Sequence, residues 1–453
     1  MEAASVACAS VEGRLTLTHY LPSNFPDRTE LHHEIHARPA ADIQLPALVF
    51  YVAVVNKGVS VDDELAHLRQ LQGQSELQPD DLDANFVRLQ CDGFTLKWER
   101  HSEYSRYSIV QPLTPASRSA FLGPQLADHL LIDRGWIAGI PGKTLAAIAM
   151  GMEEIPEHDG EFNYQQLKAW FPDTQFVASV IGSTQHSCAA TDFVMREDGI
   201  VRMAVICRKS TQGTRPGRVA QRLLELETYR LLTLWGLGTA KRIGPMLGEL
   251  ERSLGEATSR LESKSEDHED LFGLHMAMAA KVERTIAECT YRFSATVAYD
   301  ALVNQRIQEL REQTISGTQS IGEFVQRRLM PAAATVTSTA RRLTSLSERV
   351  SRSSALLRAH VDIATEARSQ ELLERLAIGQ RTQLRLQVTV EGLSIAAITY
   401  YVTSLIAHGV HALEGIGLSL HAEVVAGASI PLVALMVWRF SRRIHRSIDS
   451  HID

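Results

Sequence analysis

The residue types most able to do chemistry gather in one string near the start of the sequence, LHHEIHARP at residues 31–39. Its polar members are His32, His33, Glu34, His36 and Arg38. Imidazole and carboxylate groups bind zinc, and on a helix His32 and His36 would share a face because they are four apart. The zincin motif differs, since its glutamate directly follows the first of two such histidines. The string predicts either a metal site on His32 and His36 or a structural, partner-contacting cluster.

A second polar string, KWERHSEY, occupies residues 97–104. Alternate side chains of a strand point to the same face, so Glu99 and His101 would lie together and could meet the first string. Arg100 stands between them. We group Glu99, Arg100 and His101 with the first string as one candidate polar cluster, and whether the two strings converge stays open at this point.

Other patterns fail the spacing that their chemistry requires. The string GIPGKT at residues 139–144 is not a phosphate loop, because Ile137 stands where the first glycine of that motif belongs. The string RPGR at residues 215–218 has the character of an ordinary loop-to-helix start, with proline close to the helical entry. The sequence contains no G-x-S-x-G motif of the serine hydrolases. We therefore assign no catalytic residue.

The composition is that of an ordinary folded protein, with 45% hydrophobic and 22% charged residues in a chain of 453. A formal net charge of −7 argues against a nucleic-acid binder, which would have a basic surplus. The five cysteines form no C-x-x-C pair, as expected in a reducing compartment. Residues 1–13 lack the basic start and apolar run of a secretory signal, so we expect the bulk of the chain in the cytoplasm.

Two uncharged apolar segments near the C-terminus predict a membrane hairpin. They occupy residues 393–410 and 424–438. Each covers most of a bilayer core of roughly 30 Å, which a helix crosses in about 20 residues. Buried core helices are the alternative for segments this short. The flanking charges favour the membrane, because arginines lie outside both segments and the connector at residues 411–423 contains no Lys or Arg.

The same arginines predict the topology. By the positive-inside rule, basic ends face the cytoplasm. The residues that anchor this orientation are Arg381, Arg385, Arg439, Arg442, Arg443 and Arg446. We expect a multi-pass protein of the inner (cytoplasmic) membrane, with both termini in the cytoplasm and a short external loop.

The middle of the chain, residues 218–385, is dominated by helix formers whose apolar residues recur every three or four positions. Val336, Leu343 and Val350 repeat every seven, as in a coiled coil. Breaks are expected at residues 236–238, 263–270 and 316–317 and at Pro331. We predict four or five helices, packed within one chain or as an oligomeric stalk, the last one running from Pro331 into the first membrane span.

The N-terminal part shows two similar successions of patterns, each with an apolar strand, a helix and strands around an Asp-Gly turn. The first predicts strands at residues 48–55, 85–91 and 94–98 and a helix at 61–71, capped by Ser60 and Asp63. The second predicts strands at residues 145–150, 176–181, 191–195 and 200–206 and a helix near 164–171. This order predicts an α+β domain of two β-α-β-β units with mainly antiparallel sheets.

Several strings resemble a bacterial family. They are L-H-x-E-x-H-A-R-P at residues 31–39, W-E-R-H-S-E at 98–103, D-F-x-x-x-x-D-G at 192–199, Q-R-L-L-E-L-E-T-Y-R at 221–230 and T-V-E-G-L-S-I-A-A-I-T-Y-Y at 389–401. That family is catalogued as a domain of unknown function in uncharacterised membrane-anchored proteins. The resemblance covers nearly the whole chain. It implies a membrane anchor and carries over no activity, cofactor or catalytic residue.

The arrangement also resembles the CorA-type divalent-cation channels, which have an N-terminal α/β domain and long helices that lead into the first of two terminal spans. Those channels assemble as pentamers around the first span, which implies a homo-oligomer and a divalent cation as partner. Their Gly-Met-Asn signature after the first span is absent here, where residues 407–411 are AHGVH. Ion conduction is therefore implied by the arrangement alone.

We predict three parts: an α+β domain at residues 1–215, a long-helix bundle or coiled coil at 216–388, and a transmembrane hairpin at 389–446 with a basic tail. The leading hypothesis is a non-enzymatic, membrane-anchored homo-oligomer, either a scaffold or a CorA-like ion-transport assembly. Its partners would be the lipid bilayer and copies of itself, and no nucleic acid. The alternative is a membrane-tethered metal-dependent enzyme that uses His32, Glu34 and His36.

Overall fold

The structure is a computed structural model. It describes residues 25, 26, 28 and 42–449, except for residues 83, 115–125, 157–161, 163–166, 169, 172–173, 212, 263–267 and 415–421. Side chains of residues 262, 268, 269, 414, 442 and 444–449 are likewise outside the description.

One mixed sheet forms the N-terminal part of the described chain. Its strands are β1 (Ala47–Val55), β2 (Phe86–Cys91), β3 (Phe94–Arg100), β4 (Tyr104–Pro112), β5 (Lys143–Ile155), β6 (Val177–Ile181), β7 (Ser187–Thr191), β8 (Val201–Arg208) and β9 (Gln313–Thr314). They lie in the order β2-β3-β4-β1-β5-β8-β7-β6-β9. The β5–β8 pair is parallel, and the other described pairs are antiparallel.

Short helices connect the strands and long helices follow them. The short ones are α2 (Val61–Leu68), α3 (Arg134–Ala138) and two 3-10 turns at Pro79–Leu82 and Leu126–His129. The long ones are α5 (Arg215–Glu262), α6 (His268–Leu310), α7 (Ile321–Glu414) and α8 (Ala422–Asp449). The predicted order, a sheet domain followed by long helices and a terminal helix pair, is confirmed.

Strand β1 lies in the middle of the sheet and is buried on both faces. Its odd-numbered residues, such as Val49 and Tyr51, belong to a core shared with α5 and the facing ends of α6 and α7. Its even-numbered residues, such as Leu48 and Phe50, belong to a second core with α2 and Trp136. A strand covered on both faces needs apolar residues at every position, which explains the unbroken run ALVFYVAVV.

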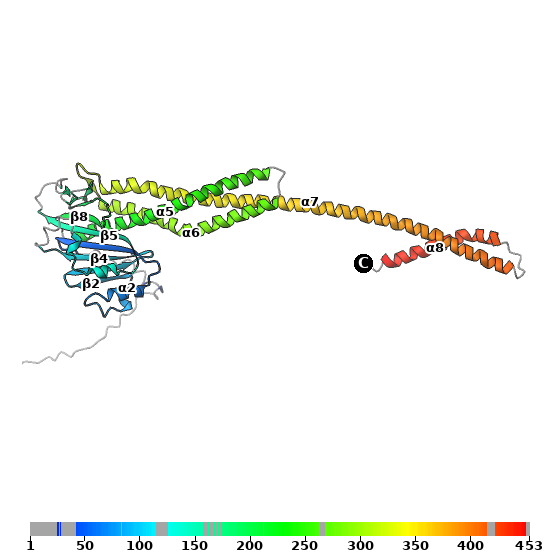
Figure 1. The fold of residues 1–453 in the computed structure, drawn as a ribbon, viewed down its shortest axis with the longest axis horizontal. Coiled ribbons are helices and arrows are strands. Elements are labelled where there is room, and N and C mark those ends of the chain that lie inside the picture. The colour runs from blue at the N-terminus through cyan, green and yellow to red at the C-terminus, as the bar shows by residue number, and fades with distance from the viewer. Residues whose placement is uncertain are drawn as a thin grey trace, which may run out of the picture. The chain divides into compact units, whose positions relative to one another are not determined.

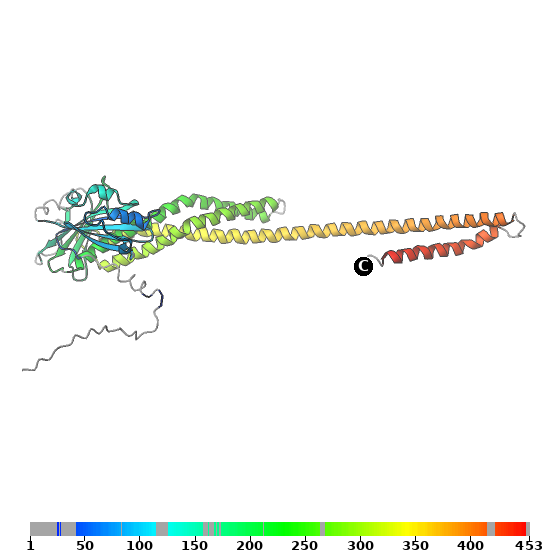
Figure 2. The ribbon, with the colours of Figure 1, turned by 90° about the horizontal axis from the view of Figure 1, so that it is seen from below.

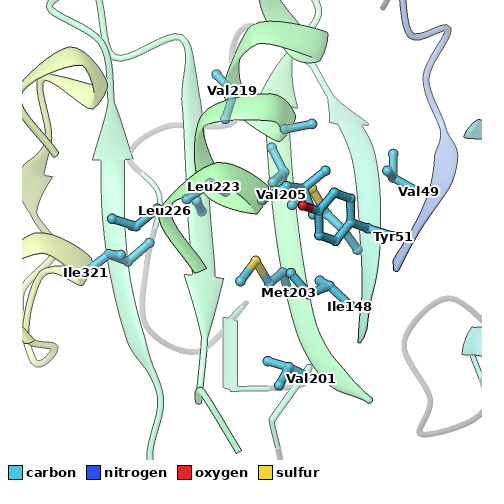
Figure 3. Close-up of a cluster of buried hydrophobic side chains, with 14 of the residues drawn as sticks. Val49, Tyr51, Ile148, Val201, Met203, Val205, Val219, Leu223, Leu226 and Ile321 are labelled. Carbon is cyan, nitrogen blue, oxygen red and sulfur yellow. The ribbon is translucent and has the colours of Figure 1, made fainter. Parts of the chain in front are cut away.

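Helix α5 covers one face of the sheet with its first four turns. Figure 3 shows Val219 and Leu223 of α5 over the strands, among Tyr51, Ile148 and Met203. Farther along, α5 packs with α6 and the first part of α7, and these helices lie side by side in both views (Figures 1 and 2). Their shared core holds Ile243 of α5, Phe293 of α6 and Val336 of α7.

Several local predictions are confirmed. Strands form at β1, β2, β3, β5, β6 and β8 close to the expected positions. Ser60 and Asp63 cap α2 reciprocally, since the Ser60 hydroxyl accepts from Asp63 N at 3.1 Å and the Asp63 carboxylate accepts from Ser60 N at 2.9 Å. Helix α7 runs through the first apolar segment, as expected.

Other local predictions are wrong. The strand predicted at 191–195 lies earlier, as β7, and β4 was not expected at all. The two halves each supply four strands to one sheet, and the predicted division into two β-α-β-β units stays a prediction. Of the helix expected near 164–171, residues 164–166 and 169 lie outside the described residues, and residues 167 and 168 are helical.

Two of the expected breaks are confirmed, since α5 ends at Glu262, α6 begins at His268 and ends at Leu310, and α7 begins at Ile321. The long helices continue through the other two. Helix α5 passes residues 236–238 and Pro245, and α7 passes Pro331. Three helices, α5, α6 and α7, therefore replace the four or five predicted, and the last of them runs into the first apolar segment. Gly236 marks a close approach instead of a break: a Cβ there would overlap Thr296 Oγ1 of α6 and lie 3.0 Å from Thr296 Cβ. The glycine lets α5 and α6 come together.

Contacts divide the chain into two compact units. One comprises Met1–Ala257 with Met276–Val350, and the other comprises Thr258–His275 with Ser351–Asp453. The first unit holds the sheet and most of the three-helix bundle. The predicted boundaries at residues 215, 388 and 446 stay predictions.

The Gly236 contact can be tested by alanine substitution. We expect Gly236→Ala to destabilise the full-length chain by about 1–3 kcal/mol, because the added methyl group overpacks the α5–α6 contact. Gly238→Ala is the matched control: it lies two residues away with nothing within 4 Å of its Cβ position. It should stabilise by up to about 1 kcal/mol through helix propensity. Thermal unfolding in detergent measures both, and equal shifts for the two variants would contradict the contact.

Candidate functional site

The sequence-predicted polar cluster falls into three places. His32, His33, Glu34, His36 and Arg38 lie outside the described residues, so the metal site on His32 and His36 stays a prediction. Among the residues that the structure does describe, no group of three His, Cys, Asp or Glu side chains is arranged to hold a metal ion. The remaining candidates are Glu99, Arg100 and His101.

Glu99 and Arg100 point to opposite faces of the sheet, as neighbours in a strand must. Glu99 faces α5 and binds Arg106, whereas Arg100 faces α2 and binds Glu64. The His101 ring stacks on Tyr104, with ring centroids 4.5 Å apart, and Tyr104 belongs to the core on the α5 side. Glu99 and His101 therefore share a face, as the alternation predicted, and Arg100 does not join them.

Glu99 is the centre of a buried network of ion pairs. Arg106 of β4 binds both of its carboxylate oxygens, with Nε–Oε2 and Nη2–Oε1 distances of 2.6 and 2.8 Å. Lys97 Nζ lies 3.1 Å from Glu99 Oε2. Lys97, Glu99 and Arg106 are each less than 10% exposed. Buried charges are tolerated only when they are paired and hydrogen-bonded, and this fork-to-fork geometry meets that condition.

The network continues from the sheet into the helices. Arg106 Nη1 lies 3.0 Å from Glu225 Oε1 of α5, and Glu225 Oε2 accepts from Arg306 Nε of α6 at 2.6 Å. Arg306 also binds Glu309, at 2.9 Å. Alternating charges thus link β3, β4, α5 and α6. This chain of pairs fixes the orientation of α5 and α6 on the sheet, because the Arg106–Glu225 pair joins β4 to α5 and the Glu225–Arg306 pair joins α5 to α6.

Neighbouring charges control the ionisation of this cluster. Burial by itself would raise the pKa of Glu99, but Arg106 and Lys97 outweigh burial and hold that pKa at about 2. The pKa of Glu225 is lowered in the same way, with burial opposed by Arg106 and Arg306. Burial lowers the pKa of Lys97, against the attraction of Glu99. Both carboxylates are therefore ionised at neutral pH.

The space beside the network is small. A cavity of about 30 Å³ is lined by Tyr51, Glu99, Arg106, Gln221 and Leu224, among others. Such a volume accommodates on the order of two water molecules. The Tyr51 hydroxyl is bonded to Thr228 Oγ1 at 2.7 Å, and burial raises the Tyr51 pKa far above its usual range. The arrangement joins elements of the fold and has no room for a substrate.

Arg100 takes part in a separate polar group on the other face. Its guanidinium binds the buried Glu64 carboxylate and donates to Val59 O at 2.8 Å. His67, one turn after Glu64, stacks on Trp136 with ring centroids 4.3 Å apart, and burial lowers its pKa. Glu64 Oε1 and His67 Nε2 are buried with no hydrogen-bond partner among the described residues. This group fastens α2 to β3.

The two C-terminal helices are long and apolar enough to cross a membrane. The apolar stretch of α7 is 11% buried and that of α8 is 0% buried, and both pass the length and composition test for a membrane span. Large apolar side chains point outward on both helices, including Leu393, Tyr400 and Leu405 of α7 and Leu432 and Met436 of α8. The core helix of a soluble protein would bury such residues. This pair could therefore span a membrane.

Polar groups in the pair are satisfied locally. The hydroxyls of Thr399 and Thr403 donate to carbonyl groups one turn earlier in α7, at 2.7 and 2.8 Å. Ser441 of α8 donates to Glu391 of α7 at 2.5 Å, so the ends of the pair that carry the arginines are joined. Arg381, Arg385, Arg439 and Arg443 are exposed, and the side chains of Arg442 and Arg446 lie outside the described part.

The fold and these sites define a class: a mixed-sheet protein extended by long helices, with a C-terminal helix pair that could span a membrane. The chain belongs to the family described as Protein of unknown function (DUF3422), which it matches over residues 23–448. The expected membership of a family of unknown function is thereby confirmed, and the resemblance to CorA-type channels stays a prediction. No curated protein matches the chain.

The ion-pair network predicts a specific acid sensitivity. Because the pKa of Glu99 falls from 4.5 to about 2 on folding, its stabilising effect is complete above pH 4.5 and is lost as the pH falls to 2. The loss is on the order of 3 kcal/mol. Glu99→Gln should be less stable at neutral pH and should lose less stability over that pH range. Denaturant unfolding at several pH values measures this, with the exposed Glu76→Gln as control. Parallel curves for wild type and Glu99→Gln would contradict it.

Proposed function

We propose that the chain is a membrane-anchored protein whose α7 and α8 helices cross the bilayer as a hairpin near the C-terminus. The observation that carries this proposal is the outward orientation of the apolar side chains, with 11% and 0% of the two apolar stretches buried. In lipid these side chains need no protein cover. Both segments are helical, and a helix pairs most of its backbone groups internally, which is what a segment that crosses hydrocarbon requires.

The orientation follows from charge. Arginines precede the first segment and follow the second, while residues 411–423 between them contain no Lys or Arg. The positive-inside rule then places both basic ends in the cytoplasm. The sheet unit and the C-terminus would lie on the cytoplasmic side of the inner membrane, and the connector between the two segments outside it.

We further propose that the anchored protein is a homo-oligomer, in which copies of α7 associate. Between the bundle and the apolar segment, α7 exposes large apolar residues at Leu356, Ile363, Leu373, Leu384 and Val388, each more than half exposed. These five lie near one side of the helix, as in a coiled coil, and Leu372, Leu376 and Leu386 are exposed on other sides. Such an assembly would serve as a scaffold or, as in the CorA-type arrangement, as an ion-transport assembly for divalent cations.

Deletion of the helix pair tests the anchor. A chain ending at residue 388 should be released from membranes, whereas the full-length chain and a control lacking only residues 450–453 should float with lipid in a density gradient. Flotation separates insertion from aggregation, since aggregates sink. Full-length chain that stays in the soluble fraction, or a truncated chain that still floats, contradicts the anchor. Light scattering of the detergent-solubilised chain tests the oligomer in the same preparation, and a monomer mass contradicts it.

A further inference from the structure

A pocket of about 340 Å³ lies beside the start of α5, between the β6–β7 turn and the end of α6. The side chains that line this pocket carry a net positive charge. Arginines and one histidine supply its basic lining, with two hydroxyl groups and a single carboxylate beside them. These residues are Arg215, Arg218, Arg222, Arg311, His186, Ser183, Thr184 and Glu309.

The three arginines of α5 are arranged to act together. Arg215, Arg218 and Arg222 are spaced by three and four residues, so they lie on one face of the helix. Arg222 is paired with Glu309 at 3.2 Å, but Glu309 also binds Arg306. Arg215 and Arg311 have no carboxylate partner among the described residues, and Arg218 bonds only to the Thr214 hydroxyl there. The pocket therefore has an excess of positive charge in a chain whose net charge is −7.

The ionisation of His186 is affected by the excess of positive charge in the pocket. Its pKa is lowered by partial burial and by the positive charges of Arg215, Arg218 and Arg222. Its Nδ1 lies 2.7 Å from Ser187 Oγ. The ring lies over Gly182, where a Cβ would overlap His186 Nε2 and where φ is +84°. Only glycine fits both the backbone conformation and the ring, so the β6–β7 turn is shaped to place this imidazole at the pocket.

We propose that this pocket binds a small phosphate-bearing ligand. Guanidinium groups bind phosphate oxygens in bidentate fashion, and several arginines facing one space are the usual means of phosphate recognition. The N-terminus of α5 adds a partial positive charge at the same place. The volume is at the lower end of the roughly 300–1,000 Å³ of small-molecule sites, as a compact ligand requires. The proposal is independent of the membrane anchor.

Calorimetric titration of the full-length chain in detergent tests the site, with two soluble probes. Pyrophosphate represents free phosphate compounds, and glycerophosphoglycerol represents a lipid headgroup without acyl chains. We expect at least one probe to bind, and the double variant R215Q/R218Q to weaken that binding at least tenfold. The control R252Q/R284Q removes two exposed arginines of α5 and α6 that do not line the pocket, and it should change the affinity less than twofold.

The pKa of His186 provides a second measurement of ligand binding, independent of the affinity. Because a bound anion offsets the arginines, saturation with the better probe should raise the pKa of His186 in an NMR titration, and R215Q/R218Q should abolish that rise. Tighter binding of pyrophosphate assigns the ligand to soluble compounds, and tighter binding of glycerophosphoglycerol assigns it to headgroups. Absence of binding by both probes, or equal weakening by R252Q/R284Q, overturns the proposal.

Discussion

The packing of the first turns of α5 against the sheet is the contact on which the rest of the structure depends. Val219, Leu223 and Leu226 cover the strand residues that face them, and without this cover the apolar face of β1, β5 and β8 would be exposed to water. A sheet with one face this apolar is stable only when a second layer buries it. The helix that begins the long-helix region is therefore also part of the core of the sheet domain.

The buried ion pairs fix the position of α5 and α6 on the sheet, which apolar packing alone does not determine. Apolar contacts have no direction, so α5 and α6 could slide on the sheet at little cost. The Arg106–Glu225 and Glu225–Arg306 pairs lie between the sheet and the helices. Both pairs can form only when β4, α5 and α6 have one particular relative position. The same rigid layer holds the arginines of α5 in line at the adjacent pocket. The network and the pocket thus depend on the same helix placement.

The sequence predicts those features whose cause is local. The run of β1, the reciprocal cap of Ser60 and Asp63, and the apolar stretches of α7 and α8 each follow from patterns within a few residues. Strand β4 escaped prediction because Ser105, Arg106 and Gln111 are polar and yet buried. Some of their partners, such as Glu225 for Arg106 and Asn56 for Ser105, lie far away in sequence. Gly236 was misread for a similar reason, since its role depends on Thr296 across the helix contact.

For the candidate site too, the sequence predicts the local features and misses the contacts between distant residues. Alternation along β3 placed Glu99 with His101, but the grouping of Arg100 with them was wrong, and the pattern could not reveal Arg106 as the partner that joins Glu99 to Glu225. Residues 215–218 were interpreted as an ordinary helix start, because a sequence does not show that Arg222 and Arg311 face the same space. Only the three- and four-residue spacing of arginines in α5 would have given a hint.

Hydrogen exchange of native full-length chain tests most directly whether the sheet and the first turns of α5 form one cooperative unit. Amides of β1 and of residues 219–232 should exchange through openings of the same free energy, with the same dependence on denaturant. Exchange of residues 219–232 through a much easier opening, while β1 stays protected, would contradict this account.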